Sequence, residues 1–456
     1  MINSTFSVTI GVEFELILAF HETLLHQHLT STNNPATIIK SIPPSTRHNL
    51  SQVHENYQRE RPQYMGWALT SRAAVAYESE RRSGILSLKD QFSKYGYRGY
   101  AGEVLTLAQS ILRPQQDVAV HDTLVKRTKF GTWYLTQDNS LVGVGKEVLG
   151  KELSAEGREG EEVERWDNHP VELVSRVLPF TRESLDEIET YLALLRGGET
   201  QQQLQHMAFA TEACGFHVHV GLPTPTPTPG EEEPLPTFSL PTLQHLAYIL
   251  VMYEKPMRAL FPSWRREGSK NAELDLMSNL ESFLPEEELG EWDDEVDNFE
   301  TLNARREEDD ETISEEDNDD EKPTCPTVSF AEARKMIFAP STTLESLAEL
   351  MGGTRKSRLV NWTYLLRHNL PRTIEFRQHE GTLDGEDVRC WINFVVGVVR
   401  LAEERGRVEG VGEGYDGRGY RWREWDERIS VGDLVEMCGL GEEGERWVER
   451  RVGMWK

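Results

Sequence analysis

Acidic, imidazole and guanidinium side chains recur at alternate positions in three well-separated stretches of the chain. The pairs are Glu13 and Glu15 within Phe6–Leu18, His217 and His219 within Phe216–Gly221, and Glu375 and Arg377 within 372–384, where His379 continues the polar row. Residues two apart on a β-strand point to the same face, and the intervening positions here are mostly apolar. Each stretch therefore predicts a strand with one apolar face and one face that carries chemical groups.

The two glutamates of the first stretch suggest a cation site. On one strand face their carboxylates would lie roughly 6–7 Å apart and would repel by on the order of 2.5 kcal/mol at an effective dielectric of about 20. A bound cation would reverse the sign of that energy, and carboxylate oxygens with an imidazole suit Mg²⁺ or Mn²⁺. Solvent-facing glutamates remain an alternative. The two histidines could equally bind zinc or form a hydrogen-bonded polar ladder.

The charge of the chain is concentrated in one window. The 456 residues carry a formal net charge of −28, and residues 281–321 hold 21 acidic and two basic side chains. This balance argues against general binding to nucleic acids or anionic membranes. The remainder is only mildly acidic, so a local arginine-lined phosphate site stays possible.

Targeting and redox signals indicate a cytoplasmic protein. No run approaches the roughly 20 apolar residues that span a bilayer, and the first 20 residues lack a basic leader region. The four cysteines are widely spaced, which predicts reduced thiols rather than a disulfide framework or a zinc ribbon.

Composition divides the chain into six segments. They are the N-terminal part of a main domain (1–222), a Pro-rich insertion (223–236), a helical part (237–280), an acidic and largely disordered insertion (281–322), the C-terminal part of the main domain (323–405), and a Gly-rich loop with a small helical tail (406–456). A possible capping box, Ser184-x-x-Glu187, predicts the start of one helix. The apolar stripe over 385–404 predicts another helix, packed on the apolar back of the strands.

Several motifs taken together resemble one family. They are Gly-Val-Glu13-Phe-Glu15, Trp133 through Asp138-Asn-Ser140, Val-Glu172-Leu-Val-Ser175, Cys-Gly-Phe-His217-Val-His219-Val-Gly, and Thr-Ile-Glu375-Phe-Arg377-Gln-His-Glu-Gly-Thr-Leu-Asp384. Their order is similar to that of the putative amidoligase family, a branch of the carboxylate-amine ligases related to glutamine synthetase and glutamate-cysteine ligase. The resemblance runs, with interruptions, from about residue 5 to residue 401.

The resemblance implies a fold and a set of roles. The fold would be α+β, with a curved antiparallel sheet, helices on its convex face, and ATP with Mg²⁺ or Mn²⁺ on its concave face. The implied metal ligands are Glu13, Glu15, Glu172, His217 and Glu375. His219 and Arg377 would lie near nucleotide phosphates or an acyl-phosphate, Arg377 and Glu375 would be catalytic, and Asp138 and Ser140 are candidates on the substrate side.

The function implied is ATP- and divalent-metal-dependent joining of a carboxylate to an amine through an acyl-phosphate. Small-molecule and peptide substrates both fit the sequence, which leaves the acid, the amine and the oligomeric state open. One alternative is a zinc-dependent hydrolase in which the two histidines and a glutamate hold the metal. The other is a non-catalytic scaffold that recruits a basic partner through the acidic insertion.

Overall fold

The computed structural model describes residues 6–24, 28, 97–112, 118–120, 130–136, 141–158, 163–197, 205–223, 236–265, 330–352, 359–366, 372–408 and 430–455. The acidic window lies outside these ranges, as do residues 224–235 of the Pro-rich insertion. The candidates Asp138 and Ser140 also lie outside the described residues.

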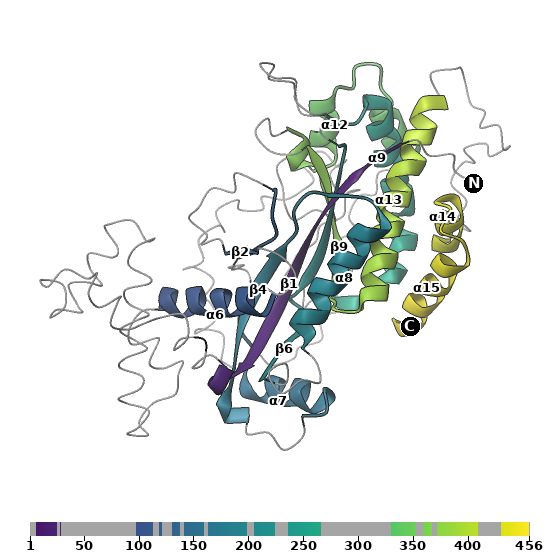
Figure 1. Cartoon of the computed structure of the whole chain (residues 1–456). Helices are drawn as coiled ribbons and strands as arrows, with labels where there is room; N and C mark the ends of the chain where they lie inside the picture. Colours follow the sequence, from purple (N-terminus) through teal and green to yellow (C-terminus); the bar gives the residue numbers. More distant parts are fainter. Residues whose placement is uncertain are drawn as a thin grey trace, which may run out of the picture.

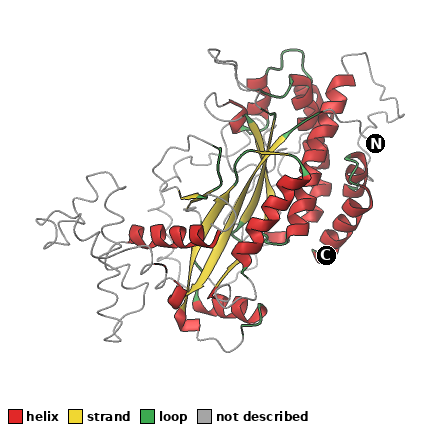
Figure 2. Cartoon of the chain, in the orientation of Figure 1, coloured by secondary structure: helices red, strands yellow, loops and turns green. Residues whose placement is uncertain are grey.

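An open sheet of nine strands forms the centre of the described part of the chain (Figure 2). Its order is β2 (Ala119–Val120), β3 (Tyr134–Thr136), β4 (Trp166–Val174), β1 (Thr9–His21), β7 (Gly215–Gly221), β9 (Thr373–Glu380) and β8 (Val360–Asn361), while β5 (Leu178–Pro179) and β6 (His206–Phe209) also pair with β1. The expected α+β class is confirmed. The expectation of a purely antiparallel sheet is wrong at one edge, because β2 and β3 pair in parallel.

The apolar row of β1 faces a layer of helices. Val12, Phe14 and Leu16 are fully buried in the main hydrophobic core. The longer helices that contribute to this core are α6 (Tyr97–Leu112), α8 (Arg182–Arg196), α9 (Leu240–Met257) and α13 (Gly385–Val408). Figure 1 shows α8, α9 and α13 along the same side of the sheet. The predicted helix at 385–404 is thus confirmed, and so is its packing on the apolar side of the strands.

Two helix starts show how local side chains fix these elements. The N-cap of α8 is Thr181, whose side chain accepts a hydrogen bond from the Ser184 backbone N–H. Ser184 therefore occupies the third helical position and is not the cap that the capping-box pattern predicts. At the start of α13, the Asp384 carboxylate accepts hydrogen bonds from the backbone N–H groups of Glu386 and Asp387, which satisfies donors that the helix itself leaves unpaired.

The opposite face of β1 is divided into an apolar half and an acidic half. Ile17 and Ala19 pack in a second, smaller core with Leu149 and Leu153 of α7 (Lys146–Ala155). Glu13 and Glu15 lie toward the other end of the same face. The helix α7 therefore covers one half and leaves the acidic half to other elements.

The remaining described elements lie around this framework. They are α11 (Phe330–Ile337), α12 (Leu344–Leu350), α14 (Val431–Met437), α15 (Gly441–Met454), and the 3₁₀ turns η2 (Val163–Arg165), η4 (Arg258–Leu260), η5 (Ser263–Arg265) and η8 (Thr363–Leu366). Within the described ranges, no helix has both the length and the apolar character to cross a bilayer. Cys214, Cys390 and Cys438 are buried free thiols, as predicted.

Candidate functional site

Strand pairing brings the predicted polar residues into adjacent positions on one face of the sheet. Glu13 of β1 lies opposite His217 of β7, and His219 of β7 lies opposite Glu375 of β9. On the other side of β1, Glu15 lies opposite Glu172 of β4. Because directly opposed residues in a sheet point to the same face, four strands contribute to one polar cluster.

The His217 imidazole lies between the two glutamates of β1. Its Nδ1 is 3.6 Å from Glu13 Oε2 and its Nε2 is 3.7 Å from Glu15 Oε1. The Nδ1 atom is also 3.5 Å from Glu375 Oε1. The ring is 3% exposed, so the carboxylate pair foreseen from the Glu-x-Glu spacing faces an imidazole rather than water.

Glu13, His219 and Glu375 form the tightest group of candidate metal ligands. One ligand atom from each lies within 4.8 Å of the others, and His219 Nε2 is 3.4 Å from Glu13 Oε1 and 3.9 Å from Glu375 Oε1. Two ligand atoms that each lie about 2.1 Å from one ion are separated by roughly 3.0–3.6 Å. The group therefore has nearly the dimensions of one coordination sphere.

The hydrogen bonding of two imidazole nitrogens in this cluster also favours a metal site. Within the described part of the chain, His217 Nδ1 and His219 Nε2 are buried and make no hydrogen bond. Buried polar atoms normally have a partner. Carboxylate oxygens of Glu13 lie 3.6 Å from His217 Nδ1 and 3.4 Å from His219 Nε2. A cation between them would be coordinated by imidazole nitrogen and carboxylate oxygen together.

Two side chains fix the orientation of Glu375, which is 1% exposed. The Asn361 side-chain amide donates to Glu375 Oε2 at 2.7 Å, and Arg377 Nη1 donates to Glu375 Oε1 at 2.5 Å. Asn361 in turn accepts a hydrogen bond from the Thr363 backbone N–H, which fixes its own rotamer. Asn361 is thus a site residue that the motif analysis did not find.

The charges in the cluster stabilise one another in the ionised state. Burial opposes ionisation of Glu13, but the imidazoles of His219 and His217 outweigh burial and hold the pKa of Glu13 well below its usual range. Burial likewise opposes ionisation of Glu375, and Arg377 with the two imidazoles lowers its pKa. Burial disfavours the charged form of His219, yet the carboxylates of Glu13 and Glu375 raise its pKa. The carboxylates of the site therefore create a negative potential that favours the protonated form of His219.

Arg265, at the end of η5, is a second site residue that the sequence patterns did not reveal. It is 4% exposed, and its Nη2 donates to the Cys214 carbonyl beside the cluster. Burial lowers the pKa of this guanidinium, whereas Glu15 and Glu380 oppose that shift. The Nε atoms of both Arg265 and Arg377 are buried and make no hydrogen bond among the described residues. Two guanidinium groups with spare donors therefore border the carboxylates.

Gly215 allows the backbone to approach the cluster closely. Its N–H donates to Glu15 Oε2 at 2.6 Å. A Cβ at this position would lie 2.7 Å from His217 Nε2, 2.9 Å from Glu15 Oε2 and 3.0 Å from Arg265 Nη2. Only glycine leaves room here for all three side chains.

His379 lies on the opposite face from the one that strict alternation predicts. An irregularity in the β7–β9 pairing shifts the register between Phe216 and Val218, so that His379 pairs with Phe216. Its ring is fully buried against Phe216, Phe261 and Trp391 in the apolar layer. The prediction that His379 continues the polar row is therefore wrong, because a β-bulge inserts an extra residue and reverses the facing of those beyond it.

His379, Glu380 and Asp387 form a second group with the composition of a metal site. Here the positive charge is supplied by an arginine side chain. The Arg451 guanidinium of α15 donates through Nη2 to Glu380 Oε2 at 2.6 Å and through Nη1 to Asp387 Oδ2 at 3.3 Å. The Trp447 indole N–H donates to Asp387 Oδ1 at 2.7 Å. This group is accordingly a buried ion-pair network that joins α15 to β9 and α13.

The predicted site residues thus have three outcomes in the structure. Glu13, Glu15, His217, His219, Glu375 and Arg377 converge on one face. Glu172 is 7% exposed and lies beside Glu15 by strand register. Asp138 and Ser140 are outside the described residues. The geometry also places His219 among the candidate metal ligands. Its position near phosphates stays a prediction from the resemblance.

Comparison with known proteins supports the family resemblance over the first half of the chain. Residues 7–229 match the family model described as putative amidoligase enzyme. The matched segment includes Glu13, Glu15, Glu172, His217 and His219, and it ends before β9. No curated protein and no solved structure matches the chain. The resemblance is confirmed for residues 7–229 and indicates a ligase-type enzyme that forms amide bonds.

Proposed function

Because residues 7–229 carry the pattern of the putative amidoligase family, we propose that this chain is an ATP- and divalent-metal-dependent carboxylate-amine ligase. The observation that carries the proposal is the convergence of Glu13 and His219, from the matched segment, with Glu375 from a strand outside it. The strand β9, which lies beyond the matched residues 7–229, contributes the third candidate ligand of this group. Such convergence supports an active site rather than three unrelated polar strand faces.

The donor set fits Mg²⁺ or Mn²⁺. Glu13, His219 and Glu375 would hold one ion, while Glu15, Glu172 and His217 border the same face and could hold a second. Hard carboxylate oxygens with an imidazole are typical of these ions, and Mn²⁺ accepts the nitrogen more readily than Mg²⁺. When bound, such an ion would neutralise charge on the phosphate oxygens of ATP.

The two buried arginines would bind the anionic groups of the reaction. Arg377 donates to Glu375 and Arg265 donates to the Cys214 carbonyl, and within the described ranges the Nε of each makes no hydrogen bond. Guanidinium groups recognise phosphate and carboxylate through paired N–H donors. In this arrangement they would orient the substrate carboxylate toward the γ-phosphate and stabilise the transferring phosphoryl group.

The proposed reaction has two steps. An oxygen of the substrate carboxylate bonds to the γ-phosphorus as the bond to the ADP oxygen breaks, which gives an acyl-phosphate and ADP. The amine nitrogen then bonds to the acyl carbon as inorganic phosphate leaves, and the excess proton of the amine is lost to water. The buried walls of the cluster would limit the competing attack of water on the acyl-phosphate.

A zinc-dependent hydrolase remains the second candidate because both histidines approach Glu13. His217 Nδ1 and His219 Nε2 lie 3.6 Å and 3.4 Å from its two carboxylate oxygens. Two histidines and one glutamate form a known catalytic zinc set. The ligase is favoured because Glu15, Glu172 and Glu375 add more carboxylate than one zinc ion requires.

ADP release tests the proposal. The full chain would be incubated with ATP, Mg²⁺ or Mn²⁺ and a panel of acids and amines, and ADP and phosphate would be measured. We expect ADP formation that needs both an acid and an amine and that falls roughly 10²-fold or more in Glu375→Gln. The control Glu147→Gln changes the same charge on the exposed side of α7 and should retain the wild-type rate. Absence of ADP from the whole panel, or an unchanged rate in Glu375→Gln, would contradict the ligase.

A further inference from the structure

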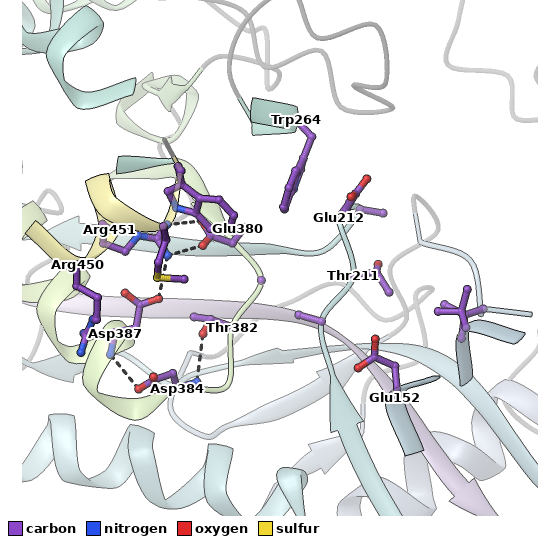
Figure 3. Close-up of a pocket in the computed structure, with 17 residues that line it drawn as sticks. Glu152, Thr211, Glu212, Trp264, Glu380, Thr382, Asp384, Asp387, Arg450 and Arg451 are labelled. Atoms are coloured by element: carbon purple, nitrogen blue, oxygen red, sulfur yellow. Dashed lines mark hydrogen bonds and ion pairs between the residues drawn. The ribbon is translucent and has the colours of Figure 1, made fainter. Parts of the chain in front are cut away.

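A cavity of about 790 Å³ adjoins the polar cluster (Figure 3). Its lining comes from α7, the connection between β6 and β7, η5, the loop between β9 and α13, and the end of α15. Figure 3 shows Arg450, Arg451 and Asp387 together on one side and Glu152, Thr211 and Glu212 on the other. None of these lining residues belongs to the candidate metal ligands.

Arg265 connects the cavity to the cluster, because both Glu15 of the cluster and Glu380 of the cavity lining act on its guanidinium. Thr211, Glu212 and Ala213 line the cavity, and Gly215, two positions later, donates its N–H to Glu15. Trp264 also lines the cavity, and the next residue, Arg265, borders the cluster. Glu212, at one end of the lining, is therefore three positions along the chain from Gly215, which contacts Glu15.

Most of the charged groups in the lining already have partners. Arg451 pairs with Glu380 and Asp387, and Arg450 pairs with Glu386 at 3.0 Å. The Asp384 carboxylate caps α13. Among the described residues of the lining, both arginines are therefore paired with carboxylates.

Glu152 and Glu212 are the acidic side chains of the lining without such a partner among the described residues. Glu152 is half-buried, and burial together with nearby Glu156 raises the pKa of its carboxyl. Glu152 also follows Val148 by four positions on α7, so both point to the same side of the helix. A positively charged ligand would relieve the unfavourable electrostatics of this end of the cavity.

The remaining walls are apolar and aromatic. Val148 and Met454 are 40% and 57% exposed, and both line the cavity, which accounts for two unusually exposed large hydrophobic side chains. The indoles of Trp264 and Trp455 meet edge to face, with ring centroids 5.4 Å apart. Indole faces attract organic cations, and aliphatic walls suit a chain of methylene groups.

We propose that this cavity binds the amine substrate, and that the substrate is a primary alkylammonium whose charge lies between Glu152 and Glu212 and whose methylene chain packs on Trp264, Val148 and Met454. This inference rests on the proposed ligase function, to which it adds the class of the amine and its place. The acidic end would exclude acids and select amines. Because Glu212 is three positions from Gly215, the nitrogen held at this end would, after losing a proton, be the nucleophile for the reacting carbonyl.

Calorimetric titration of the full chain with n-butylammonium tests the cavity directly, without ATP or metal. The neutral isostere 1-butanol has the same apolar chain and should bind at least tenfold more weakly. The double variant Glu152→Gln, Glu212→Gln should lose at least tenfold in affinity for n-butylammonium, whereas the control Glu147→Gln should bind as wild type. Equal binding of 1-butanol, an unchanged double variant, or no binding of n-butylammonium to wild type would overturn the proposal.

Two further titrations test amine binding independently of the ligase function. They also distinguish a free diamine from a lysine side chain as the ligand. Glu13→Gln should remove metal binding and leave amine binding unchanged, and loss of amine binding in this variant would overturn the cavity assignment. Tighter binding of 1,4-diaminobutane than of Nα-acetyl-lysine methylamide would support a free diamine, and the reverse order would support a lysine side chain. Near-ultraviolet circular dichroism of each variant would confirm that its tertiary packing is retained.

Discussion

Alternate spacing identifies side chains that share a strand face, and it found six of the residues that converge in the site. It could not find Asn361 or Arg265, because each acts alone from a short element. Asn361 belongs to a two-residue strand, and Arg265 ends a single 3₁₀ turn. The weak signal for Asn361 was a polar residue between Val360 and Trp362. No sequence signal distinguishes Arg265 from the other arginines of the chain.

Substitution of Gly215 by alanine should damage the site through overpacking. The new Cβ would lie within 3.0 Å of three polar side chains. We expect a loss of about 1–3 kcal/mol in the free energy of unfolding, together with weaker binding of Mn²⁺, measured by urea unfolding and by calorimetry.

The control for this change is Gly11→Ala on β1, in the same sheet. A Cβ there would meet only ordinary contacts, at 3.5 Å from the His219 Cβ and 3.9 Å from Ser175 Oγ. Gly11→Ala should therefore change both quantities little. Equal effects of the two substitutions would contradict the close approach at Gly215.

Removal of the Asn361 side chain should loosen Glu375 as a metal ligand. Residues that orient metal ligands typically contribute 10–100-fold to metal affinity, and we expect Asn361→Ala to weaken Mn²⁺ binding by about that factor. Asn168→Ala is the matched control, because Asn168 is a comparably buried amide on β4 that contacts Val144. The control should lose stability without losing Mn²⁺ affinity. If both variants bind Mn²⁺ as wild type, Asn361 does not position a ligand.

At the scale of elements, hydrophobic periodicity located the long strands and helices but missed their irregularities. The first strand runs from Thr9 to His21 rather than from Phe6 to Leu18, and the extension adds Ala19 to the apolar half covered by α7. Similarly, the bulge in β9 moved His379 to the apolar face. Hydrophobic periodicity does not show where a strand carries an extra residue relative to its partner, so such a shift cannot be predicted from the sequence.

The attachment of α15 depends on one buried ion-pair network. Arg451 is 2% exposed and pairs with both Glu380 and Asp387. Arg451→Met would leave two buried carboxylates uncompensated, and we expect a loss of about 3–5 kcal/mol in the free energy of unfolding at pH 7. Arg450→Met is the control, because Arg450 forms an exposed pair with Glu386 worth about 0–1 kcal/mol. Similar losses in the two variants would contradict the role of the network.

The pH dependence of stability gives an independent test of the same network. Burial opposes ionisation of Glu380 and Asp387, but His379 and Arg451 lower the pKa of each carboxyl below its ordinary value. Their stabilising contribution is therefore present above the unfolded pKa values of about 4 and is lost as the pH falls toward the lowered folded values. The difference in stability between wild type and Arg451→Met should shrink below about pH 4, as measured by urea unfolding from pH 7 to pH 3. A difference that grows on acidification would contradict this assignment.

At the scale of the whole molecule, the sequence predicted the α+β class and the polar face but not the arrangement of the sheet. The order of strands and the parallel edge depend on long-range packing, which no local pattern encodes. The cavity beside the site could not be foreseen for the same reason, since five separate segments form it. The curvature of the sheet and the relation to glutamine synthetase remain predictions from the resemblance.

The measurement that most directly tests the account is thermal unfolding with ATP, in the presence and absence of Mn²⁺, for wild type and Glu13→Gln. We expect ATP to stabilise wild type only when Mn²⁺ is present, by about 2.7 kcal/mol at 100 times the dissociation constant, and we expect Glu13→Gln to lose this effect. Glu22→Gln, just beyond the end of β1, should behave as wild type. No stabilisation of wild type by ATP with Mn²⁺, or equal stabilisation of Glu13→Gln, would contradict a nucleotide and metal site on this face of the sheet.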